Sequence, residues 1–350
     1  MKRISVLLVL ALAFNTVVAQ NISDLTEINL VKTTSVKNQK RAGTCWSFAT
    51  VSFIETEVLK ATNQEFDLSE NYIVYYAYLN KARLYILKMG HHQFDQGGQA
   101  HDVLDVIKEY GIVPEANYPY NLSNHDEFYK EMKTYLDSIL QLKDLPKNWE
   151  NEFKQILNRN LGTPPTTVSY KGKEYSPKEF VKSVLEFNPN DYVELASFTE
   201  HPYYKPFILE VADNWSMASY YNVPMEDMMK IMNYALQNGY SVDWDGDVSE
   251  KEFNPQKGYA KWKFKGSDFA DEHEQMFLRL KTTDDHLMHI VGLYKDKKDV
   301  LYYKTKNSWG TYGPFAGYIY MSENYVKLKN IAIMVNKKAI PNEIKEKLNI

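Results

Sequence analysis

Residues 38–49 read Asn38-Gln39-Lys40-Arg41-Ala42-Gly43-Thr44-Cys45-Trp46-Ser47-Phe48-Ala49 and include the only cysteine of the 350-residue chain. A lone cysteine cannot form a disulfide within its own chain, so Cys45 is either an incidental small buried side chain or a reactive thiol. Apolar residues recur at helical spacing beyond it, which predicts a helix over 46–60 with Cys45 at its amino-terminal end. Because free N–H groups at a helix start favour a negative charge, this position is expected to lower the pKa of the thiol.

The amino terminus has the pattern of an export signal. Lys2 and Arg3 precede an apolar run over 4–14, and Ala19 is a small residue just before Gln20. The run is shorter than a membrane span requires, which favours a cleaved signal peptide over 1–19 rather than an anchor. We therefore predict a periplasmic or secreted protein whose mature chain is not inserted in a membrane. Sequencing of the mature amino terminus, expected at Gln20, tests this prediction.

The composition is that of a folded enzyme or binding domain. Hydrophobic residues make up 44% and aromatic residues 14% of the chain, which is long enough for one large domain or two lobes. The formal net charge of −4 argues against nucleic acid or an anionic membrane surface as a partner.

Helices are expected in the first part of the chain and strands in the last part. A second helix is predicted to start near Ser69, with Asp67 or Ser69 as its cap, and a third to run from Gln99 to Tyr110. The apolar spacing over 124–160 indicates more helix. Runs rich in Ile, Val, Tyr and Leu predict strands over 286–295, 299–306 and 317–321.

The segment around Cys45 resembles the active-site segment of papain-like cysteine peptidases, and more closely that of the bleomycin hydrolase and aminopeptidase C-like branch, which reads Asn-Gln-Lys. The run Asn307-Ser308-Trp309-Gly310 also matches the family and follows in the expected order. The resemblance implies an α+β, two-lobed papain-like fold with a helical left lobe and an antiparallel β right lobe. It also implies a peptidase domain over 20–350 with a mainly helical insertion at about 121–215.

The resemblance implies a Cys-His-Asn site that hydrolyses peptide bonds through an acyl-enzyme. Cys45 is the nucleophile, and Gln39 forms an oxyanion hole together with the Cys45 backbone N–H. Asn307 orients the catalytic imidazole, and Trp309 shields their hydrogen bond from water.

Two histidines compete for the role of general base. His286 stands six residues before Gly292, which is the place that the family pattern gives, whereas His289 stands three residues before it. The two have opposite parity on the predicted strand, so they should face opposite sides and only one can meet Cys45. The register favours His286 as the base and makes His289 a packed or hydrogen-bonded strand residue.

This chemistry needs no cofactor and no metal ion. The run Asp243-Trp244-Asp245-Gly246-Asp247 is similar to a calcium loop, but its glycine stands at the fourth place rather than the sixth. A strand end near the cleft is the better interpretation. His91, His92 and His101 fit no common zinc spacing, so they too are not interpreted as ligands.

Peptides or proteins are the expected substrates. Their backbone could approach the cleft wall closely at Gly97 and Gly98, because glycine has no side chain. Bleomycin hydrolases carry a carboxy-terminal arm that restricts cutting to chain ends, and residues 333–341 resemble the segment before it. Since the chain stops soon after, at Ile350, we expect endopeptidase cleavage beside aminopeptidase cleavage. A catalytically silent binding protein is the alternative function, and assembly into a homo-oligomer is left open.

Overall fold

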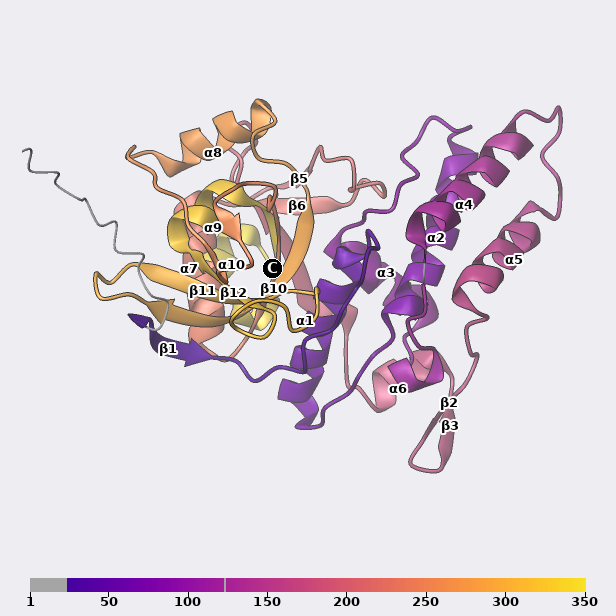
Figure 1. Ribbon diagram of the computed structural model, residues 1–350, viewed down its shortest axis with the longest axis horizontal. Coiled ribbons are helices and arrows are strands. Elements are labelled where there is room, and N and C mark those ends of the chain that lie inside the picture. Colours follow the sequence, from indigo (N-terminus) through magenta and orange to yellow (C-terminus); the bar gives the residue numbers. More distant parts are fainter. Residues whose placement is uncertain (1–23, 123) are drawn as a thin grey trace, which may run out of the picture.

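The computed structural model describes residues 24–122 and 124–350. The predicted signal peptide over 1–19 lies outside these ranges and stays a prediction. None of the helices within them is long and apolar enough to cross a membrane. Figure 1 shows two lobes, with the sheet on the left, most of the helices of the first half of the chain on the right, and α1 (Cys45–Thr62) between them.

Helix α1 is the central element of the fold, and it begins at Cys45 as the sequence predicts. Every residue from Trp46 to Leu59 is buried, because the helix has protein on all of its sides. It contacts other helices on one side and β10 (His286–Lys295) on the other. Cys45 itself is partly exposed, at the end of α1 where the two lobes meet.

The next two helices complete the helical lobe where local sequence signals predict them. Helix α2 (Glu70–Leu87) starts after Ser69, whose side chain accepts the Tyr72 N–H as an N-cap. Helix α3 (Ala100–Tyr110) ends at Gly111, which has a φ of 85° that favours glycine. Both predicted helices are therefore confirmed. Their apolar side chains form one core with α1.

The predicted insertion is helical in its first part and β-structured in its last part. Helices α4 (His125–Leu140) and α5 (Trp149–Leu161) pack beside α2, at the far side of the helical lobe in Figure 1. Three smaller elements follow, namely β2 (Val168–Tyr170), β3 (Lys173–Tyr175) and α6 (Pro177–Ser183). Strand β4 (Tyr192–Ala196) already pairs with the main sheet, so the end of the predicted range belongs to the β lobe.

The β lobe contains one large sheet with the strand order β5-β6-β4-β13-β7-β10-β11-β12-β9-β8, and β1 pairs with β10. Most neighbouring strands are antiparallel as expected, but β4 with β6 and β9 with β12 are parallel pairs that the sequence did not predict. The strands not yet given are β1 (Thr26–Leu30), β5 (Pro206–Ile208), β6 (Ser219–Asn222), β7 (Val242–Gly246), β8 (Phe253–Asn254), β9 (Tyr259–Ala260), β11 (Leu301–Lys306), β12 (Tyr318–Ser322) and β13 (Asn330–Asn336).

Side chains alternate along β10 between two cores. Leu287 joins the core of the helical lobe, whereas Met288 and Ile290 pack with α7 in a second core. Helices α1 and α7 therefore cover opposite faces of this strand. The helices of the β lobe are α7 (Met225–Gln237), α8 (Phe269–Leu278), α9 (Glu323–Lys329) and α10 (Asn342–Leu348).

Candidate active site

Cys45 stands at a helix start that no side chain caps. Thr44 makes no side-chain hydrogen bond to the first turn of α1, and this turn holds no acidic residue. The N–H groups at the start of α1 are therefore not taken up by a cap. The backbone of Leu287, the residue after His286 on β10, lies close enough to the thiol to lower its pKa.

The loop before Cys45 is fixed by the segment that precedes α3. The Gly43 N–H lies 3.2 Å from Gln96 Oε1 and 2.9 Å from His125 Nδ1. Trp46 Nε1 donates to the Gln96 carbonyl at 3.1 Å. Residues 96–98 therefore flank the thiol on the side of the helical lobe.

The imidazole of His286 is held by Asn307. His286 Nε2 lies 2.8 Å from Asn307 Oδ1, and the same oxygen accepts the Ser308 N–H at 2.7 Å. Because Oδ1 accepts both bonds, Nε2 is the protonated nitrogen and Nδ1 is the free base. The half-buried ring of Trp309 packs on the imidazole with 4.9 Å between ring centroids.

His289 faces a different part of α1. Its Nδ1 lies 2.9 Å from Ser52 Oγ, and its side chain is 0% exposed. Ser52 is about two turns, or roughly 10 Å, further along α1 than Cys45. The prediction that His289 is a packed and hydrogen-bonded strand residue is confirmed.

Gln39 lies against the segment that carries Asn307. The Gln39 N–H donates to the Ser308 carbonyl at 2.8 Å, and Ser308 Oγ donates to Gln39 Oε1. Gln39 Nε2 uses one of its hydrogens on the Ala42 carbonyl at 2.7 Å. Among the described residues, no second acceptor for Gln39 Nε2 is found, so its other hydrogen is free to donate.

Gly97 and Gly98 do not form the open wall that the sequence predicts. Gly98 is buried, and a β-carbon on it would lie 3.0 Å from the Trp46 ring. Gly97 faces the Asp213 carboxyl group so closely that a β-carbon would lie 1.8 Å from Oδ2. Another part of the chain therefore covers this wall, and the expectation is corrected.

Three carboxyl groups act electrostatically on the thiol, and none of them was predicted from the sequence to be part of the site. Burial raises the pKa of Cys45 to about 12, and the charges of Asp245, Asp284 and Asp213 add to that rise. Burial also lowers the pKa of His286 to about 4, although its hydrogen bond to Asn307 acts in the opposite direction. Burial thus favours the neutral form of both groups in the absence of substrate, which is the opposite of the lowered thiol pKa that the helix start alone predicts.

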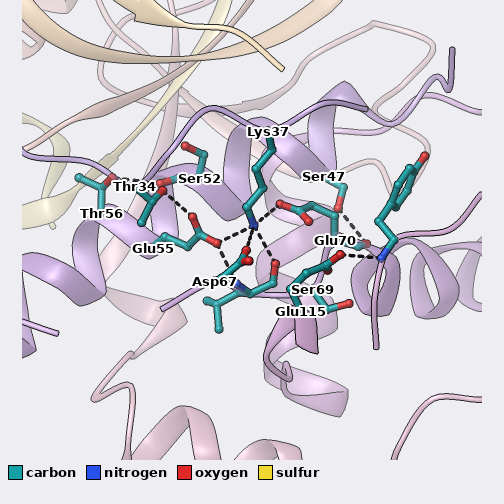
Figure 2. Close-up of polar contacts among 12 residues, drawn as sticks. Thr34, Lys37, Ser47, Ser52, Glu55, Thr56, Asp67, Ser69, Glu70 and Glu115 are labelled. Carbon is teal, nitrogen blue, oxygen red and sulfur yellow. Dashed lines mark hydrogen bonds and ion pairs between the residues drawn. The ribbon is translucent and has the colours of Figure 1, made fainter. Parts of the chain in front are cut away.

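A buried ionic network lies next to these residues in the helical lobe (Figure 2). Lys37 Nζ lies 2.7 Å from the carboxyl groups of Glu55 and Glu70, whose side chains are 0% and 1% exposed. Burial raises the pKa of Glu70 to about 8, and the charge of Lys37 offsets this only in part. Since the Lys37 carbonyl also accepts the Gly310 N–H at 2.9 Å, the network fixes the segment that leads to Gln39. No local motif marks these contacts in the sequence.

We expect Lys37→Met to lower the free energy of unfolding by about 3–5 kcal/mol, because it leaves two buried carboxyl groups without their cation. Denaturant titration of the purified protein measures this. Lys32→Met is the matched control, since Lys32 is exposed on the same segment, and it should change stability by less than about 0.5 kcal/mol. Equal effects of the two substitutions would contradict the structural role of the network.

Residues 9–350 match the model of a protein family described as the Peptidase C1-like family. The chain is 27% identical over 376 residues to Aminopeptidase G of Lactobacillus delbrueckii subsp. lactis, covering 91% of this chain and 84% of that protein. It is 25% identical over 394 residues to Cysteine proteinase 1, mitochondrial, of Saccharomyces cerevisiae, with 95% and 79% covered. The crystal structure of PepW from Lactobacillus rhamnosis has the same fold, with a TM-score of 0.79, 20% identity and 93% and 84% of the two chains covered.

Proposed function

The chain belongs to the Peptidase C1-like family and is a cysteine-type peptidase of papain-like fold, and from this we propose that Cys45 is its nucleophile and His286 its general base. The hydrogen bond between His286 Nε2 and Asn307 Oδ1 carries this proposal, because it leaves Nδ1 free as a base beside the thiol. Peptides or proteins are the substrates of this family, in line with its relatives.

The proposed reaction uses only side chains of this chain and water. Cys45 Sγ attacks the carbonyl carbon of the peptide bond while His286 Nδ1 takes the thiol proton. The negative charge on the carbonyl oxygen is stabilised by the Gln39 side-chain N–H and the Cys45 backbone N–H. The carbon–nitrogen bond then breaks, and His286 returns the proton to the leaving amine. Water attacks the resulting thioester and gives a proton to His286, which protonates the sulfur as the acid product leaves.

Asn307→Ala tests the geometry of the base. We expect it to lower kcat on the order of 10²-fold, because the imidazole loses its orientation but keeps its capacity to take a proton. In the wild type, the hydrogen bond to Asn307 raises the pKa of His286. Without this bond the pKa of His286 should fall, so the acidic limb of the pH–rate profile should move to lower pH. Asn307→Asp keeps an acceptor for Nε2 and should recover part of the activity. Unchanged kcat and pH profile in Asn307→Ala would contradict the proposal.

The expectation of endopeptidase cleavage depends on an unoccupied cleft. The described carboxy-terminal segment does not enter the site, since α10 packs against α7 on the face of β10 opposite α1. The ion pairs of Lys230 with Glu343 at 2.5 Å and of Lys347 with Asp227 at 3.3 Å hold it there. The position of α10 therefore supports a cleft that the carboxy-terminal segment does not block. Cleavage of internal bonds then requires that no other segment of the chain blocks the cleft beside the thiol.

A further inference from the structure

The loop over 209–218 crosses from the β lobe to the helical lobe beside the thiol. It connects β5 with β6, and Figure 1 shows this hairpin extending from the sheet toward the helices. Its Asp213 carboxyl group lies against the α-carbon of Gly97, where even an alanine would clash with it. Because residues 96–98 flank Cys45, a substrate backbone cannot lie along Gly97 while the loop is in this position.

The loop is firmly anchored in this position. Its Trp215 is buried, and Trp215 Nε1 donates to Asp102 Oδ2 on α3 at 2.7 Å. The Trp215 carbonyl lies 2.5 Å from His92 Nε2, and Ser216 Oγ lies 2.9 Å from His101 Nε2. Asn214 hydrogen-bonds three backbone groups within the loop. The contacts of Trp215 and Ser216 with the helical lobe, together with the bonds of Asn214 within the loop, make the loop a fixed part of the site.

The carboxyl groups that act on the thiol are themselves buried, and burial raises the pKa of each of them. Neither carboxyl oxygen of Asp245 has a hydrogen-bond partner among the described residues, and its side chain is 3% exposed. Burial and the adjoining Asp284 carboxyl raise the pKa of Asp245 well above its usual range. Lys81 offsets the charge of Asp213, but it is buried behind Gly97, where it donates to the carbonyls of Asp95 and Gly97. A cation that enters with the substrate would be stabilised on the side of the thiol.

We propose that the loop over 209–218 determines where this enzyme cuts: it closes the cleft beyond the first substrate residue, and Asp213 binds the free α-ammonium group of that residue. This inference rests on the proposed function of Cys45. It gives the loop the effect of restricting cleavage to chain ends, and it favours removal of amino-terminal residues over internal cleavage.

The same arrangement couples substrate binding to the chemistry. Burial, and to a smaller extent the carboxyl groups, disfavours a thiolate in the resting site, as the raised pKa of Cys45 indicates. An ammonium group between these carboxyl groups and the sulfur would offset their effect and favour transfer of the thiol proton to His286. A peptide with a blocked amino terminus brings no such charge, and its blocking group would meet the loop.

A pair of peptides with the same sequence, one with a free and one with an acetylated amino terminus, tests this proposal when the products are identified by mass spectrometry. The wild type should cleave the free peptide at its first bond and the acetylated peptide at least about 100-fold more slowly. Asp213→Asn should lower kcat/KM for the free peptide about 10- to 100-fold, because it removes one partner of a close charge pair. Asp213→Gly should open the wall at Gly97 and raise cleavage of the acetylated peptide.

Glu210→Gln is the matched control, because Glu210 is an exposed carboxylate on the same loop, and it should leave both rates unchanged. Thermal unfolding of each variant verifies the fold, and Asp213→Asn keeps the shape of the side chain should Asp213→Gly fold poorly. Equal cleavage of both peptides by the wild type, with Asp213→Asn unaltered, would overturn the role of the loop and leave the peptidase function intact. No cleavage of either peptide by the wild type would overturn the proposed function as well.

Discussion

Cys45→Ala should abolish peptide hydrolysis, with a loss on the order of 10⁵-fold or more. The substitution removes the atom that forms the bond to the substrate, and the remaining groups cannot form a thioester. Cys45 is partly exposed and its truncation removes one sulfur atom, so the free energy of unfolding should change by less than about 1 kcal/mol. Product analysis together with thermal unfolding separates loss of chemistry from loss of fold. Activity above about 1% of wild type in a folded variant would contradict nucleophilic catalysis by Cys45.

The rate at which iodoacetamide labels the wild-type Cys45, measured as a function of pH, tests whether the pKa of the thiol is raised. Only the thiolate reacts with iodoacetamide, and burial together with three carboxyl groups raises the pKa of Cys45 to about 12. The labelling rate should therefore be slow at neutral pH and rise about tenfold per pH unit through pH 9, since the thiolate fraction grows as pH approaches the pKa. The chain has no second cysteine to contribute to the signal. A rate that is already at its plateau near pH 6 would contradict a neutral resting thiol.

Local signals in the sequence were sufficient to predict the elements that carry the site. Ser69 before α2, Gly111 after α3 and the start of α1 at Cys45 follow from the chemistry of helix ends, which depends on a few neighbouring residues. The alternation along β10 likewise separated His286 from His289 without any knowledge of the other strands. Each of these features depends only on residues that are close together in the sequence, and each residue pattern is compatible with few local structures.

The charge environment of the thiol was not predictable in this way. Asp213 and Gly97 are far apart in the sequence, and only the packing of the β5–β6 loop on the helical lobe brings them together. A glycine is compatible with such an approach, but the residue does not reveal what approaches it or from where. Asp245 was correctly interpreted as part of a strand end near the cleft, yet its effect on Cys45 depends on burial that a single sequence does not give. The lowered thiol pKa was inferred from the helix start alone, and burial, with a smaller contribution from these more distant groups, reverses it.

His286→Ala should lower kcat/KM on the order of 10³-fold or more, whereas His289→Ala should leave the activity of the folded protein within about threefold of wild type. His286 Nδ1 is the nitrogen that can take the thiol proton, because Nε2 is bonded to Asn307. The substitution should leave the fold intact, since Asn307 Oδ1 keeps its bond from the Ser308 N–H.

His289 is a matched control because it lies on the same strand, is equally buried, and also bonds a side chain. Its partner is Ser52, about two turns of α1 away from Cys45, so its imidazole cannot reach the thiol. His289→Ala should instead lower the free energy of unfolding by about 1–3 kcal/mol, because it empties a buried position and leaves Ser52 without this hydrogen bond. Rates normalised to the folded fraction, with denaturant titration of both variants, distinguish the two effects. A folded but inactive His289→Ala beside an active His286→Ala would show that the base is His289 and that the assignment from β10 register and the Asn307 bond is wrong.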